Sequence, residues 1–263
     1  MILTPLQYGL GALSGGGVGF TLGLVGGGGS ILAVPLIVYL VREPDPHVAI
    51  GTSALAVAAN AALGMITHAR HGAVKWTIAL TYAFAGILGA LAGSTAGKAV
   101  GGQKLLFLFA ILMIVVGVLM LRRRSRPGDP DARMTRRNAP RVIGYGLGTG
   151  LVSGFFGIGG GFLIVPGLLA ACELPILDAI GSSLVAVTAF GLTTAVNYAA
   201  SGLVDWPLAA SFIAGGLAGS RLGAALARRL AGARGRLTTI FASLIFVVAA
   251  YMMWRSASAV FRL

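Results

Sequence analysis

The chain has 263 residues, of which 57% are hydrophobic and only 10% are charged, and its formal net charge is +13. Soluble globular domains carry about 25% charged residues, so this composition excludes an ordinary water-soluble fold. The long apolar runs and the mean hydropathy of +0.90 indicate an all-α, multi-pass integral membrane protein in contact with lipid. The basic residues do not indicate nucleic-acid binding, because many gather between apolar runs at 122–141, where they act as topology anchors.

Taken in chain order, the apolar segments form two sets of four. The first set is expected at 8–41, 48–69, 76–97 and 103–121, and the second at 142–172, 178–199, 206–227 and 237–254. Glycines interrupt the opening segment of each set, at 26–29 and at 157–161. Because glycine in a helix interior costs about 1 kcal/mol relative to alanine, each cluster is expected to break its helix.

The two sets match each other at an offset of 130–131 residues. GGGGSILAVP at 26–35 aligns with GIGGGFLIVP at 157–166, AIGTS at 49–53 with AIGSS at 179–183, and HGAVKW at 71–76 with SGLVDW at 201–206. Such a repeat predicts two homologous halves. The expected domains are an N-terminal transmembrane repeat at 1–121, an Arg-rich cytoplasmic linker at 122–141 and a C-terminal transmembrane repeat at 142–263. Small residues at 86–93 and 216–223 favour close helix packing.

The distribution of basic residues favours re-entrant hairpins for segments one and five. With hairpins, about fourteen basic residues lie inside and five outside, against about twelve and seven for eight full spans, with Arg221 set aside in both. Each half then crosses the membrane an odd number of times, which makes the two halves inverted repeats, as in many secondary transporters.

The broken helices are candidates for an anion site. Broken backbone at membrane depth is tolerated only where it is buried in protein or lines a cavity. Helix starts near Ser30 and Phe162 would direct unpaired N–H groups and positive dipole ends at an anion near mid-membrane. The alternative is that the glycines only allow the hairpins to pack closely.

The glycine motif resembles a known family. The pattern G-[GI]-G-G-[GS]-x-[LI]-x-V-P occurs in both halves, each time followed about 15 residues later by A-I-G-[TS]-S, and this is similar to the sulfite exporter TauE/SafE family. The resemblance implies a bacterial inner-membrane transporter of sulfur-containing anions and organosulfonates. The first motif departs from the second by a fourth glycine and by a serine, so the two hairpins are not expected to be fully symmetric.

Polar residues inside the expected spans are further candidates. Hydroxyls at matched positions could donate to an oxyanion, or could bond to a carbonyl one turn earlier. The two asparagines are either interhelical contacts or ligand donors, and Arg221 could hold an anion or extend to the membrane surface. The candidate substrate-binding residues are Gly27, Gly28, Gly29, Ser30, Thr52, Ser53, Asn60, Gly159, Gly160, Gly161, Ser182, Ser183, Asn197 and Arg221.

The sequence favours a secondary transporter, most simply an exporter, of a small anion. An anion channel that uses the same hairpins as a selectivity filter is the alternative. A membrane-embedded enzyme is disfavoured, because the sequence has no catalytic triad, no nucleotide-binding motif and no acidic residue in mid-span. A single cysteine and three histidines predict no metal site and no cofactor. The oligomeric state and the coupling ion do not follow from the sequence.

Overall fold

The computed structural model describes residues 3–25, 27–122, 129, 132–159, 161–229, 243 and 245–255, and all regular structure among them is helical. The first half contains α1 (Pro5–Val25), the 3-10 helix η1 (Gly27–Leu32), α2 (Ala33–Pro35), the π-helix η2 (Leu36–Val41), α3 (Pro46–Arg70), α4 (Trp76–Ala99) and α5 (Gly102–Arg122). The second half contains α6 (Ala139–Phe156), α7 (Gly161–Cys172), α8 (Ile176–Ala199) and α9 (Trp206–Arg229), followed by a shorter apolar helix at Ile245–Arg255.

Among the described residues, four helices are long and apolar enough to cross a membrane, namely Pro46–Arg70, Trp76–Ala99, Gly102–Leu119 and Leu177–Ala199. A helix of 24 residues such as α4 is about 36 Å long, which exceeds the roughly 30 Å hydrocarbon core of a bilayer. Large apolar side chains on the outer surface, such as Phe84 at 70% exposure and Leu222 at 66%, suit contact with lipid. The chain is therefore a multi-pass membrane protein.

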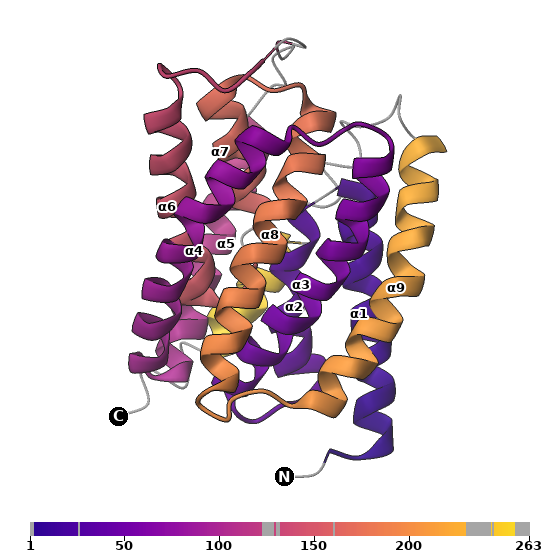
Figure 1. The fold of residues 1–263 in the computed structure, drawn as a ribbon. Helices are drawn as coiled ribbons and strands as arrows, with labels where there is room; N and C mark the ends of the chain where they lie inside the picture. Colours follow the sequence, from indigo (N-terminus) through magenta and orange to yellow (C-terminus); the bar gives the residue numbers. More distant parts are fainter. Residues whose placement is uncertain are drawn as a thin grey trace.

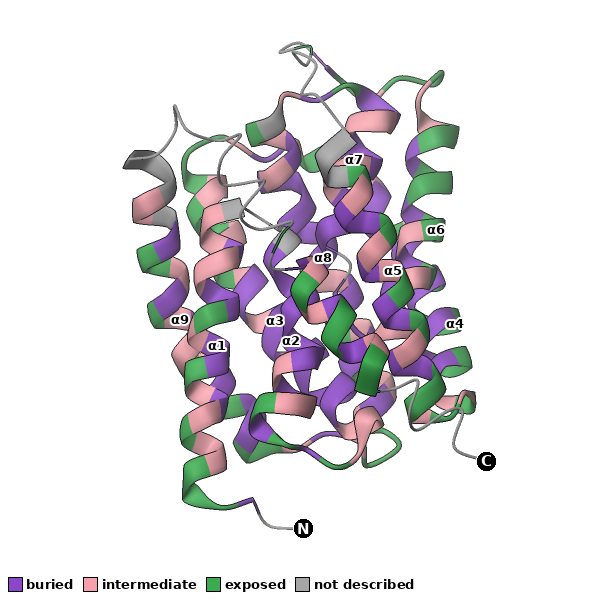
Figure 2. Cartoon of the chain, turned by 180° about the vertical axis from the view of Figure 1, so that it is seen from behind, coloured by how far each residue is buried: buried purple, intermediate pink, exposed green. Residues whose placement is uncertain are grey.

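Helices α3 and α8 form the centre of the bundle. In their apolar windows 61% and 67% of the residues are buried, against 39% in α5. The two helices pack against each other, and the other long helices surround them (Figure 1). Seen from behind, buried residues gather on α3, α8 and the segments next to them, whereas exposed residues mark the outer faces of α4, α6 and α9 (Figure 2).

The helix boundaries agree with the expected segments to within a few residues. Asp45 caps α3 by accepting a 2.8 Å hydrogen bond from the His47 amide, and Pro46 follows in the first turn. Helix α6 starts at Ala139, three residues earlier than expected, because Pro140 has a backbone angle suited to a first helical turn. The last expected segment, 237–254, is described only at residue 243 and from residue 245 on.

Two helix pairs cross with their backbones in contact, α1 with α9 and α4 with α6. A Cβ added to Gly219 of α9 would overlap the Gly16 carbonyl of α1, and one added to Gly89 of α4 would overlap the Leu147 carbonyl of α6. Small residues allow membrane helices to approach this closely. The close packing expected for 86–93 and 216–223 is confirmed.

Two helical hairpins fold back on themselves. In the first hairpin, residues 5–41, the Gln7 side-chain amide donates a 3.0 Å hydrogen bond to the Val41 carbonyl, so its two ends lie together. In the second hairpin, residues 139–172, Arg141 near the start and Cys172 at the end line one cavity. The two hairpins enter the bundle from opposite ends, since α1 begins at the lower end and α6 at the upper end (Figure 1).

Candidate functional site

The tips of the two hairpins meet inside the bundle, where η1 packs against α7. The second tip turns through two glycines with left-handed backbone, Gly157 at φ +67° and Gly159 at φ +64°. A Cβ on Gly159 would lie 2.9 Å from a methyl of Val57 on α3 and 3.3 Å from a methyl of Val187 on α8. These two valines are 130 residues apart, the same separation as the sequence repeat. Gly159 therefore lies between equivalent points of the two central helices.

Glycine is required at these tips by close approach as well as by backbone angle. A Cβ on Gly157 would overlap the side chain of Ile50, and one on Gly29 would overlap the backbone of α1 at Leu22. Any larger residue would push the hairpin arms apart or displace the tips from α3. The second tip therefore packs directly on side chains of α3, and Gly29 of the first tip packs on the backbone of its own hairpin arm, α1.

The first break differs from an open turn. Gly27, Gly28, Gly29 and Ser30 lie within the 3-10 helix η1, and Ser30 is fully buried. A 3-10 turn tightens the backbone where the chain changes direction after α1. In the second break Gly159 lies in a turn and Gly161 begins α7, while Gly160 falls outside the described residues. The two breaks are therefore not copies of each other.

The four candidate hydroxyls on α3 and α8 are buried and have partners. Ser53 donates to the Ile50 carbonyl at 2.9 Å and lies 3.4 Å from the Gly157 carbonyl, and Ser183 donates to the Ile180 carbonyl at 2.7 Å. One residue earlier, the hydroxyls accept hydrogen bonds from the other half. Thr52 accepts from the Asp205 amide at 3.0 Å, and Ser182 accepts from the Lys75 amide at 2.9 Å. Thr52 and Ser182, which match each other in the sequence alignment of the two sets, therefore make the same kind of contact with the opposite side of the bundle.

Asn60 is the candidate whose polar groups have no partner. It lies near the middle of α3 and is 3% exposed, and neither its Oδ1 nor its Nδ2 makes a hydrogen bond. Its side chain fills the space beside Gly216 of α9, as Phe190 fills the space beside Gly86 of α4. Leaving a buried polar group unpaired costs about 1–3 kcal/mol. A ligand or a water molecule that bonds to this amide would offset the cost.

Asn60 also lies close to the second hairpin tip along α3. It follows Val57 by three residues, which places the two side chains on neighbouring parts of one helix face. Val57 is the residue that contacts Gly159. Asn60 therefore lies about one helical turn along α3 from the point where Gly159 packs on this helix.

Asn197 is bonded elsewhere in the bundle, and Arg221 faces outward. Asn197, near the end of α8, donates to Ser94 at 2.6 Å and to Thr95 at 3.0 Å, and its side-chain oxygen accepts from Lys98 at 2.9 Å. Arg221 is exposed on the outer surface of α9. The structure therefore brings Gly157, Gly159 and Ser53 together at the second hairpin tip, with Asn60 one turn farther along α3, whereas Thr52 and Ser182 contact the loops before α9 and α4.

Sequence reasoning passed over three residues that the structure makes prominent. Val57 and Val187 flank Gly159, and the repeat offset could have paired them, but two valines carry no chemical signal. Lys98 links α4 to α8 by bonding to Asn197 and, at 2.8 Å, to the Ser201 hydroxyl. In the described part of the chain, no three His, Cys, Asp or Glu residues gather closely enough to hold a metal ion.

Comparison with known proteins decides the family. The pattern of the sulfite exporter TauE/SafE family matches residues 11–252, nearly the whole chain. The chain belongs to this family. This membership, with that of its relatives, makes it a membrane transporter rather than an enzyme.

Relatives share most of their length with this TauE/SafE chain. A "Probable membrane transporter protein" of Xylella fastidiosa (strain 9a5c) is 50% identical over 244 residues, which covers 92% of this chain and 94% of the relative. The YunE protein of Bacillus subtilis (strain 168), with the same description, is 27% identical and covers 79% of this chain and 84% of its own length. A similar protein of Methanocaldococcus jannaschii is 26% identical, and the match covers 69% of this chain and 70% of that protein. No solved structure matches the chain significantly.

Proposed function

We propose that this transporter exports small sulfur-containing anions, such as sulfite or organosulfonates like sulfoacetate, across the bacterial inner membrane by a secondary mechanism. The meeting of the two glycine-broken hairpins between α3 and α8, with the unpaired Asn60 amide one turn away, carries this proposal. Neutral hydrogen-bond donors bind an anion less tightly than an ion pair with lysine would. Moderate affinity suits a protein that must also release its cargo.

The anion would be held by backbone amides of the hairpin tips, at Gly27–Ser30 and Gly159–Gly161, with Asn60 as a side-chain donor. Thr52, Ser53, Ser182 and Ser183 would position the backbone around it or rotate to donate. Asn197 and Arg221 would act only on entry or exit, because Asn197 is bonded to Ser94 and Lys98 and Arg221 is exposed. Since Ser30, Ser53 and Ser183 are fully buried, a ligand could enter only if the hairpins move relative to the central helices.

We further propose that residues 1–121 and 142–263 are inverted repeats joined by the linker at 122–141. Contacts at the repeat offset support this. Gly19 of α1 faces Gly216 of α9, and Gly150 of α6 faces Gly86 of α4 in the same way. The contact between Thr52 and Asp205 has its counterpart between Ser182 and Lys75. Hairpins entering from opposite ends are what a two-fold axis in the membrane plane would produce.

The basic end of the bundle is assigned to the cytoplasm. The α3–α4 turn, the start of α6 and the end of α9 lie at the upper end in Figure 1, and the basic residues Arg70, Lys75 and Arg141 belong to this end. Short loops rich in arginine and lysine are retained on the cytoplasmic side of bacterial inner membranes. The linker would then be cytoplasmic as well.

A ligand screen on the purified protein tests the proposed cargo. A ligand at 100 times its Kd stabilises the folded state by about 2.7 kcal/mol, so sulfite, thiosulfate, sulfoacetate and taurine can be compared by thermal shift. We expect at least one to raise the melting temperature and to show saturable flux in liposomes. Flux that never saturates would favour an anion channel, and the absence of both stabilisation and flux for all four would contradict the proposal.

A further inference from the structure

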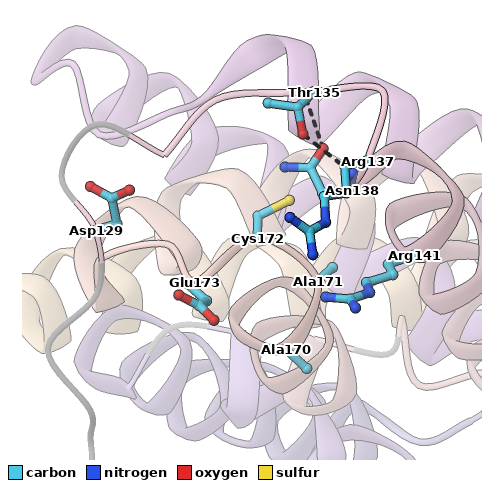
Figure 3. Close-up of a pocket in the computed structure, with 9 residues that line it drawn as sticks. All are labelled: Asp129, Thr135, Arg137, Asn138, Arg141, Ala170, Ala171, Cys172 and Glu173. Carbon is cyan, nitrogen blue, oxygen red and sulfur yellow. Dashed lines mark hydrogen bonds between the residues drawn. The ribbon is translucent and has the colours of Figure 1, made fainter.

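A cavity of about 210 Å³ opens at the end of the bundle where the second hairpin begins and ends (Figure 3). One part of its wall comes from the residues just before α6 and from the first turn of that helix, and the other from the last residues of α7. The cavity is therefore distant from the second glycine break, which lies at the other end of both helices.

Two guanidinium groups line this cavity without a carboxylate partner. Arg137 and Arg141 are four residues apart and both are exposed. Within the described part of the chain neither forms an ion pair, although Glu173 and Asp129 line the same cavity. Figure 3 shows the arginines on one side of Cys172 and the two carboxylates on the other. The positive side of the cavity is thus separated from the negative side.

The turn that carries Arg137 is held in place by hydrogen bonds. The Thr135 amide donates to the Asn138 side-chain oxygen at 2.8 Å, and the Asn138 amide donates to the Thr135 hydroxyl at 3.3 Å. The Asn138 side-chain amide also donates to the Arg133 carbonyl at 2.9 Å. These bonds fix the backbone next to α6, so the two arginines are presented together rather than on a free linker.

We propose that this cavity is a second anion site, which binds small oxyanions through Arg137 and Arg141 before they reach the hairpin tips. Guanidinium groups bind oxyanions in a bidentate manner, and two of them facing one cavity raise the local anion concentration. Cations near the start of a helix are disfavoured by its dipole, so helix stability does not account for their place. The interpretation of the bound oxyanion as cargo rests on the proposed function. Oxyanion binding in the cavity is independent of that function.

The single cysteine of the chain reports on this cavity, because Cys172 is part of its wall. The modification rates of its thiol by an anionic and by a cationic methanethiosulfonate, measured on the full-length protein in detergent, give a ratio that depends on the local charge. In Arg137→Gln/Arg141→Gln we expect the anionic-to-cationic ratio to fall about fivefold at 0.15 M salt, as expected for two unit charges within one Debye length. Methanesulfonate at millimolar concentration should slow the modification in the wild type only.

A matched control separates the cavity from overall charge. Arg133→Gln/Arg136→Gln removes the same charge from exposed residues of the same segment that do not line the cavity, and it should keep both the rate ratio and the protection. Since Cys172 is only 8% exposed, Ala170→Cys in a Cys172→Ala background gives a second, more accessible thiol in the wall. Equal ratios in the two double variants, or no protection by methanesulfonate at either thiol, would overturn the proposal. A failure of transport alone would leave these results unchanged.

Discussion

Replacing Asn60 by leucine should make the protein more stable and less active. Leucine has the same branching at Cγ as asparagine, so it is the nearest apolar match for the side chain beside Gly216, and it removes both unpaired polar atoms. Exchanging an unsatisfied buried group for an apolar group of the same shape recovers its desolvation cost, about 1–3 kcal/mol. For a protein of this size each kcal/mol corresponds to about 2–4 °C, so a rise of several degrees in melting temperature is expected.

The same substitution at Asn197 is the control. There the amide donates to Ser94 and Thr95 and accepts from Lys98, so Asn197→Leu breaks three side-chain bonds and should lower the melting temperature. Thermal unfolding in detergent and initial flux in liposomes would be measured for both variants. The reasoning is refuted if Asn60→Leu lowers the melting temperature, or if it raises it and transport stays at the wild-type rate.

Three further predictions concern the hairpins and the end of the bundle next to the first hairpin. Gly159→Ala should abolish flux, because Gly159 has φ +64° and the new methyl would lie 2.9 Å from a methyl of Val57. Gly144→Ala is the control and should leave flux unchanged, since no atom lies within 4 Å of its added methyl. Equal flux in the two variants would mean that the tip tolerates a side chain. In a cysteine-free background, thiols placed at Thr4 and Arg42 should be labelled from the same side of the membrane, and labelling from opposite sides would show that residues 5–41 cross it fully. Burial raises the pKa of Glu43 above 4.5, and the Asp205 carboxylate raises it further to a lesser degree. The hydrogen bond from the Asp45 amide lowers the pKa but does not cancel the effect of burial. The folded state then favours the protonated acid, so stability falls as pH rises through that pKa, and Glu43→Gln should melt higher than the wild type at pH 7 but not at pH 4; equal melting at pH 7 would contradict this.

The helix positions followed from the sequence because membrane depth imposes long apolar runs. Segments such as 48–69 and 76–97 have clear polar ends, and they became α3 and α4 with shifts of one or two residues. The breaks were predictable too, since several glycines in an apolar run disfavour a helix. The form of the first break, a 3-10 turn, was not, because it depends on packing against α1 and α7.

The partners of the candidate side chains could not be predicted. Thr52 bonds to Asp205 and Ser182 to Lys75, and each of these contacts depends on how one half packs on the other. The exposure of Arg221 depends on the rotation of α9 about its axis, which small residues on several faces leave undetermined. For the same reason, no pattern in the sequence shows that Asn60 is left without a partner while Asn197 has three.

The pairing of α1 with α9 has a consequence for the order of assembly during synthesis. The glycine face of α1 finds its matching surface only on a helix made nearly 200 residues later, whereas α4 meets α6 after a single intervening helix. At about 5–20 residues per second, α1 would wait about 10–40 s in the membrane beside lipid or an insertion factor. A nascent chain that stalls before α9 would therefore expose an unmatched, glycine-rich helix, and quality control of this protein would be decided at the last steps of translation.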